Sequence, residues 1–263
     1  MARHRELGRP VVIFAAGKIE PGVHPTAKIL GLTVNVDIVI SSVVAALVIC
    51  TIALLVSRRA TSGVPGKVQA TFEWVNATAT DLADSAVGPE GRKFVPLGVT
   101  IFWFILTCNW LDFLPTIMHP GHSEPILPAP TGDVNLPLAM ATVVIIWVHV
   151  ESLRARRARG YVKHYFKPYA ALAPINAIEE VTKPITLTFR LFGNLFSGGL
   201  MVAVILALVP IYVAPVLQLG WQLFDTGLLG LIQAYIFMLL TMIYFGMAMS
   251  HDEPEHVALE TSH

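Results

Sequence analysis

The stretch "PITLTFRLFGNLFSGGLMVAVILALV" (residues 184–209) is long and apolar enough to cross a lipid bilayer, and its only formal charge is Arg190. A transmembrane helix needs ~20 predominantly apolar residues. A charge at bilayer depth costs between ~2.5 and more than ~10 kcal/mol. Because a guanidinium does not deprotonate in proteins, Arg190 must meet an anion or water. The stretch therefore predicts a membrane helix that holds a functional arginine.

The composition of the whole chain also indicates a membrane protein. Of its 263 residues, 54% are hydrophobic and 14% are charged, and the mean hydropathy is +0.64. An average soluble domain carries about 25% charged residues. Lys plus Arg and Asp plus Glu both total 18, so no charge excess indicates nucleic acid as a partner. Cys50 and Cys108 lie in apolar runs, which favours free thiols over a disulfide or a metal site.

Five segments are long and apolar enough to be spans: 36–56, 94–114, 135–152, 185–209 and 226–249. Apolar character continues between the last two through "PIYVAPVLQLGW" (210–221). We therefore expect two long helices that are strongly tilted or lie along the membrane plane. Pro210 and Pro215 should break this run. The predicted fold class is an all-α integral membrane protein with about five spanning helices in one domain, residues 36–249.

The segment "KVQATFEWVNATATDLADSAVGPE" (67–90) is too polar to span. Phe72, Val75, Thr78 and Leu82 fall at helical spacing, which predicts an amphipathic helix at the membrane interface.

Basic residues predict the orientation of the chain. Arg58, Arg59 and Lys67 follow the first span, and "RARRARGYVKHYFK" (154–167) follows the third, whereas 115–136 contains no Lys or Arg. The positive-inside rule then makes 58–93 and 154–183 cytoplasmic. It places residues 1–35 outside and the tail 250–263 in the cytoplasm. Three arginines within the first nine residues oppose this orientation.

Polar residues inside the spans gather at helical spacing. Lys183, Thr186, Arg190, Asn194 and Ser197 share one face of their predicted helix. Other spans carry further polar residues at such spacing: Thr226, Gln233, Thr241 and Tyr244 in the last span, and Asn135, Thr142 and His149 in the third. Singly, these residues are explained by hydrogen bonds between helices. Arg190 is different, because no Asp or Glu lies mid-span in this chain, so its partner is expected in another protein.

Five blocks resemble subunit a of the F-type ATP synthase. They occur in the family's order over about four-fifths of the chain: "ATSGVPGKVQ" (60–69), "NWLDFLP" (109–115), "PTGDVNLPLAMA" (130–141), "KPITLTFRLFGN" (183–194) and "QAYIFMLLTMIYF" (233–245). The pairing of the RLFGN block with the distant QAYIF block is highly specific.

The resemblance implies a function for Arg190. In that family the arginine faces a rotating ring of small c subunits, each with one membrane-embedded carboxylate. Arg190 would favour the deprotonated carboxylate, since a nearby positive charge lowers a carboxyl pKa. It would also separate two offset half-channels, so that protons must travel with the ring. The implied protein is a non-catalytic, proton-translocating subunit of the cell inner membrane without a cofactor. Its implied partners are the c-ring, the b stalk, other synthase subunits and membrane lipid.

The resemblance also assigns candidate residues to the proton path. Asn194, Gln233 and Asp112 match positions associated with the outer half-channel, while Glu179 or Glu180, with Lys183, would lie at the cytoplasmic opening. For these opening residues, a solvated interfacial charge is an equally good explanation. The remaining candidates are polar positions inside the spans: Thr186, Ser197 and His149.

One departure from the family concerns the acid of the outer half-channel. Many bacterial relatives carry Glu nine residues after the arginine, paired with His on the last span. Here those positions are Gly199 and either Asp225 or Thr226. Asp225 could therefore be the acid that takes up the proton. Alternatively, Asp225 caps the N-terminus of the last helix.

Three other classes of protein fit the sequence less well. A proton-coupled transporter usually shows repeats and interrupted helices, which the sequence lacks. A membrane enzyme is not supported, since no HExxH, GxSxG or Walker A motif occurs. A purely structural subunit would leave Arg190 unexplained.

Overall fold

The computed structural model describes residues 26–29, 32–61, 63–111, 129–165, 173–210 and 212–249. The predictions for the N-terminal segment up to residue 25, for most of the outer loop and for the tail lie outside these ranges. The described chain consists of the following elements: β1 (Thr26–Ile29), β2 (Leu32–Asn35), α1 (Val36–Arg59), α2 (Lys67–Ala86), η1 (Pro89–Phe94), α3 (Val95–Leu111), η2 (Pro130–Gly132), α4 (Asn135–Tyr165), α5 (Ala173–Leu208), α6 (Ala214–Gln222), η4 (Leu223–Leu229) and α7 (Gly230–Met249). The elements η1 and η2 are 3₁₀-helices, whereas η4 is a π-helix.

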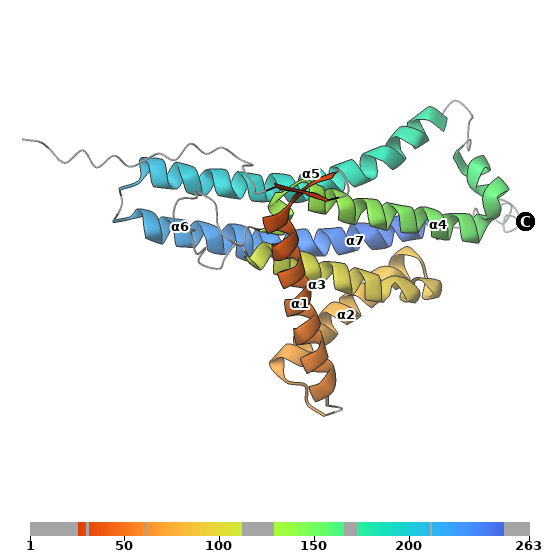
Figure 1. Cartoon of the computed structure of the whole chain (residues 1–263). Helices are drawn as coiled ribbons and strands as arrows, with labels where there is room; N and C mark the ends of the chain where they lie inside the picture. The colour runs from red at the N-terminus through yellow and green to blue at the C-terminus, as the bar shows by residue number, and fades with distance from the viewer. Residues whose placement is uncertain are drawn as a thin grey trace, which may run out of the picture.

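Within the described ranges, five helices are long and apolar enough to cross a membrane, which confirms the predicted fold class. The membrane-capable segments are Val36–Arg59, Pro89–Leu111, Asn135–Ala155, Ile178–Leu208 and Ala214–Met249. The structure adds a short antiparallel hairpin, β1–β2, which the sequence did not predict and which leads directly into α1. In Figure 1, α1 crosses the other long helices steeply.

The last two membrane helices lie side by side and are unusually long (Figure 1). Helix α5 has 36 residues, and α6, η4 and α7 form a continuous helical run of 36 residues. At 1.5 Å per residue each is ~54 Å long, whereas the hydrocarbon core of a bilayer is ~30 Å thick. Both helices must therefore tilt strongly or lie partly along the membrane plane, as predicted.

Prolines shape both helices. Helix α5 bends along its length (Figure 1), and Pro184 lies inside it. A proline there removes one helical hydrogen bond and kinks the helix. Pro210 lies in the turn after α5, where its carbonyl accepts hydrogen bonds from the N–H groups of Val213 and Ala214. Pro215 lies in the first turn of α6, where proline is tolerated, so it begins a helix and does not interrupt one.

Helix α7 lies at the centre of the core and packs against α2, α3 and α4. Its Phe237, Met242 and Phe245 are buried. The ring of Phe245 stacks on that of Phe94 with centroids 3.9 Å apart. Close packing of side chains such as these stabilises the association of membrane helices, because the hydrophobic effect does not drive helices together within lipid.

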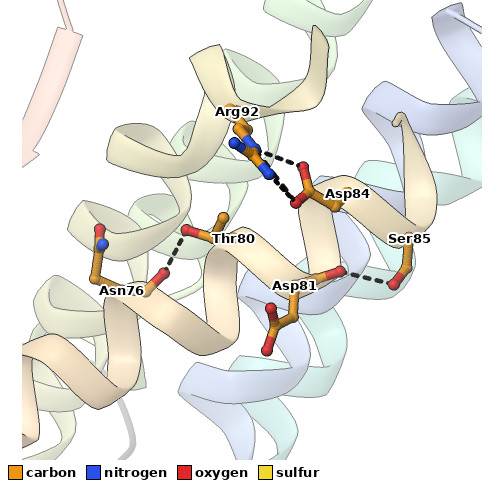
Figure 2. A network of polar contacts seen from close by, with 6 residues as sticks. All are labelled: Asn76, Thr80, Asp81, Asp84, Ser85 and Arg92. Atoms are coloured by element: carbon orange, nitrogen blue, oxygen red, sulfur yellow. Dashed lines mark hydrogen bonds and ion pairs between the residues drawn. The ribbon is translucent and has the colours of Figure 1, made fainter. Parts of the chain in front are cut away.

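The predicted amphipathic helix is α2. Its buried face is centred on Val75, Ala79 and Ala83, while Thr78 is only partly buried. The opposite face is polar and is shown in Figure 2. There Arg92 of η1 donates to both carboxylate oxygens of Asp84, at 2.8–3.2 Å. This hydrogen-bonded guanidinium holds the pKa of Asp84 below its usual range.

Candidate functional site

Arg190 is exposed on α5, on a side of the helix that the rest of the described chain leaves uncovered. The side that packs inward is formed by Leu187, Leu191 and Leu195. Among the described residues, no hydrogen bond or ion pair involves the Arg190 guanidinium. Phe189 and Phe196 on the same helix are also largely exposed. The arginine thus lies on an outer surface of the described chain, and the expectation that its partner belongs to another protein stays a prediction.

A charged cluster joins α4, α5 and α7 near Pro184. Lys183 donates to Glu180 Oε1 at 2.8 Å and lies 3.9 Å from Glu179. Its side chain is only 13% exposed, and its ammonium lies 5.6 Å from the centroid of the Tyr244 ring. His149 Nε2 is 3.8 Å from Glu180 Oε2. The structure therefore brings together the predicted Glu180, Lys183 and His149, whereas Glu179 is more exposed.

The contacts of His149 indicate which ring nitrogen carries the hydrogen of the neutral imidazole. Nδ1 lies 2.8 Å from the carbonyl oxygen of Ile145. A carbonyl can only accept a hydrogen bond, so this contact places the hydrogen of a neutral ring on Nδ1. Nε2, which then carries no hydrogen in the neutral ring, lies 3.8 Å from Glu180 Oε2.

Asp225 lies inside a continuous helix, in the π-helical turn η4, and is 5% exposed. Gln222, which precedes this turn, already has helical φ and ψ of −60° and −40°. The capping explanation is therefore wrong, because residue 225 is not at a helix N-terminus. The Asp225 carboxyl group instead lies directly against Gly198 of α5.

Buried polar side chains line the contact between α3 and the start of α7. Asn109 donates to the carbonyl of Gly230 at 3.2 Å and accepts a hydrogen bond from Thr131 at 2.7 Å. Two atoms nearby along the helix, Thr226 Oγ1 and Gln233 Nε2, are buried without a hydrogen-bond partner among the described residues. Polar atoms in such positions are usually satisfied by water.

The other predicted residues are less closely grouped. Thr186 and Ser197 lie on the exposed side of α5 with Arg190, and Asn194 is half-buried. The Ser197 hydroxyl donates to the carbonyl of Asn194 at 2.8 Å. Asp112 lies outside the described residues.

Thr131 was not singled out from the sequence, because a small residue in a loop gives no distinct signal. Gly193, Gly198 and Gly199 predict close approach of a neighbouring helix, and at Gly198 the structure places the Asp225 carboxyl group. Tyr244 was noted only as part of a polar helix face, and its contact with Lys183 depends on how α5 and α7 pack. Within the described ranges, no group of three or more His, Cys, Asp or Glu side chains could hold a metal ion.

These features define a class of protein: a multi-span membrane protein with an exposed arginine that has no ion-pair partner among the described residues, and with titratable groups on either side of it along the same helices. The chain belongs to the ATP synthase subunit a family. The sequence pattern of this family, the ATP synthase A chain, matches residues 39–246.

Individual relatives agree with this assignment. The chain is 46% identical over 234 residues to ATP synthase subunit a of Acidothermus cellulolyticus, covering 89% of this chain and 84% of the relative. It is 43% identical over 247 residues to the Mycobacterium bovis subunit, covering 92% and 98%. The Moorella thermoacetica subunit is 34% identical over 237 residues, covering 90% and 94%.

Proposed function

We propose that this chain is the stationary proton-path subunit of the membrane sector of an ATP synthase, with two half-channels that meet at Arg190. Its moving partner is the c-ring, and the b stalk holds it against the catalytic head. The chain is non-catalytic and lies in the cell inner membrane, with residues 58–93 and 154–183 in the cytoplasm. ATP synthesis is driven by protons that pass along the chain and turn the ring.

The observation that carries this proposal is the exposed Arg190 on a membrane helix, which has no hydrogen bond or ion pair among the described residues. A guanidinium in contact with lipid alone would carry the full cost of a charge in the bilayer. A ring carboxylate that faces it removes this cost, and the arginine in turn favours the deprotonated carboxylate. Each proton then releases ~2.3 kcal/mol per 100 mV of membrane potential as it crosses.

The outer half-channel is assigned to the helix faces around Asp225. This buried acid lies eight residues before Gln233, whose amide nitrogen is buried and has no partner among the described residues. The outer half-channel also includes Asn194 and Ser197. Asp112 is assigned to it from the sequence alone. Asp225 takes up the proton, and the amide and hydroxyl groups bind the water that conducts it.

The inner half-channel is assigned to the charged cluster near Pro184. Glu180 accepts a hydrogen bond from Lys183 and lies 3.8 Å from His149 Nε2, so one carboxylate contacts both an ammonium group and an imidazole ring. Such a cluster can hold a released proton and pass it to the cytoplasm. Glu179 and Thr186 flank this path on the same helix.

Replacing Arg190 by Ala tests the proposal. Arg190→Ala should abolish ATP-driven proton pumping in inverted vesicles while the complex stays assembled, because the Arg190 side chain is exposed and makes no hydrogen bond or ion pair with the described residues. Arg190→Lys should also pump poorly, since a compact ammonium lacks the planar guanidinium fork. The control is Arg92→Ala, which removes an arginine that is paired with Asp84 within the chain. Normal pumping by Arg190→Ala would disprove the mechanism.

The role of Asp225 has its own test. Asp225→Asn should strongly slow passive proton flux through the membrane sector with the catalytic head removed, because an amide does not accept and release protons near neutral pH. Adding Gly199→Glu should not restore this flux, because a Cβ at Gly199 meets no atom within 4 Å, whereas the Asp225 carboxyl group lies against Gly198. A wild-type flux in Asp225→Asn would remove Asp225 from the path.

The orientation is tested by labelling. A cysteine at Gly160, within the basic run 154–167, should react with an impermeant reagent in inverted vesicles and not in intact cells. Labelling in intact cells would reverse the two half-channels.

A further inference from the structure

We infer that Gly198 and the π-helical turn Leu223–Leu229 together form a seat that fixes the position of the Asp225 carboxyl group, which makes Gly198 a positioning residue for proton uptake. This inference rests on the proposed role of Asp225.

The first observation is the space that Gly198 leaves open. A Cβ atom built on Gly198 would overlap Asp225 Oδ2 and would lie 2.8 Å from its carboxyl carbon. A second residue of the facing helix also contacts this glycine. The Trp221 indole N–H donates a hydrogen bond to the Gly198 carbonyl oxygen at 3.2 Å. Trp221 and Asp225, four residues apart, thus both contact one residue of α5. Any side chain at 198 would displace the carboxyl group.

The neighbouring glycine shows that this requirement is local. A Cβ on Gly199 would meet no atom within 4 Å. Glycine inside a helix costs ~0.5–1 kcal/mol relative to alanine, so each needs a structural reason. Gly198 has one in the Asp225 carboxyl group. Gly199, nine residues beyond Arg190, lies two and a half turns away and so on the opposite side of α5 from the arginine.

The second observation is the π-helical turn. Asp225 and Gln233 are eight residues apart and are 5% and 6% exposed. Two turns of an α-helix take ~7 residues, so a separation of eight would rotate the two side chains apart. A π-turn holds an extra residue, because its hydrogen bonds run from i to i+5. The turn at Leu223–Leu229 therefore rotates Asp225 back toward the helix face that carries Gln233, and the Asp225 carboxyl group lies against Gly198 of α5.

The two observations explain one another. The Asp225 carboxyl group needs a position on α5 without a side chain, and Gly198 supplies that position. The π-turn directs the carboxyl group into it and keeps the group away from lipid, where a carboxylate would be unstable. We therefore expect Gly198, Asp225 and the π-turn to act as one unit.

A cross-linking experiment tests the geometry without relying on activity. In a chain that carries Cys50→Ala and Cys108→Ala, the pair Gly198→Cys and Asp225→Cys should form a disulfide under mild oxidation of the assembled complex. The matched control pairs Gly199→Cys with Asp225→Cys, and it should remain reduced, because position 199 faces open space. Cross-linking of both pairs to the same extent, or of neither pair, would refute the inferred placement of Asp225 against Gly198.

Proton flux tests the consequence. Gly198→Ala should lower passive flux by about tenfold to a hundredfold, the range expected when a reacting group is misplaced by ~1 Å. Gly199→Ala should leave flux unchanged. If Gly198→Ala fails to assemble, adding Asp225→Ala should restore assembly, since the overlapping carboxyl group is then gone. A Gly198→Ala flux equal to that of Gly199→Ala would refute the positioning role.

Failure of the seat can be distinguished from failure of the proposed function. If Asp225→Asn conducts normally but the 198–225 disulfide forms, the seat is correct and the proton role is wrong. If Asp225→Asn blocks flux and Gly198→Ala conducts normally, the proton role is correct and the seat is wrong.

Discussion

Gly246 lies where α7 passes the end of α2, and replacing it with Ala should destabilise the protein. A Cβ atom at position 246 would overlap the main-chain carbonyl oxygen of Ala86 and would lie 2.9 Å from its carbonyl carbon. A main-chain atom cannot rotate aside as a flexible side chain can. The helices must therefore separate, and overpacking of this kind costs ~1–3 kcal/mol.

The net effect combines two opposing terms. The steric cost is expected near the upper value, ~3 kcal/mol, because main chain is involved. Alanine regains ~1 kcal/mol over glycine in a helix, which leaves a net loss of ~2 kcal/mol. For a chain of this size, 1 kcal/mol shifts the melting temperature by ~2–4 °C, so Gly246→Ala should lower it by ~4–8 °C.

The assay is thermal unfolding of the purified protein in detergent, with Gly220→Ala as the matched control. A Cβ on Gly220 meets nothing within 4 Å, so this variant should melt ~2–4 °C higher through helix propensity alone. Equal melting temperatures for the two variants would refute the close approach of α2 and α7.

Three further predictions concern the polar contacts. Lys183→Ala should slow proton flux and destabilise the charged cluster by ~1–3 kcal/mol, since it leaves a partly buried carboxylate without its hydrogen-bonded cation; pumping assays and melting curves measure this. Asn109→Ala should cost ~2–4 kcal/mol in thermal unfolding, because the hydroxyl of Thr131 and one main-chain carbonyl lose their partner in a buried site. Asp84 should titrate below its ordinary value of 3.8, and Arg92→Gln should raise that pKa, as infrared titration of the carboxylate would show. Because the folded-state pKa is lowered, this pair is complete at neutral pH and is lost only as pH falls through the lowered pKa.

Much of the fold could be predicted because its signals are local. The length of apolar runs and the position of Pro210 lie in the sequence itself, and they placed the five spans and the turn between the last two. The polar face of α5 followed from helical spacing in the same way. The expectation that Arg190 finds its partner in another protein used the absence of carboxylates from the middle of the predicted spans. The structure instead places Asp225 inside the long helical run Ala214–Met249, so this expectation stays a prediction.

The features that were missed depend on how helices pack or on unusual main-chain geometry. No pattern of residue types predicts that the helix around Asp225 is a π-turn, so the sequence left open a capping role that the structure excludes. Likewise, the contact of His149 with Glu180 joins α4 to α5. Spacing within one helix could not reveal it.

The exposure of α1 has a consequence for how the protein is made. Its most apolar window has a mean hydropathy of 2.9, and only 17% of that window is buried, whereas the window within Pro89–Leu111 has 1.7 and 56%. The first helix is therefore stable in a bilayer on its own and should leave the translocon as an independent unit. The second membrane helix gains much of its stability from neighbours that are synthesised later. Full membrane integration of α3 should accordingly wait until α7 has been translated, which makes the C-terminal helix the step that completes folding.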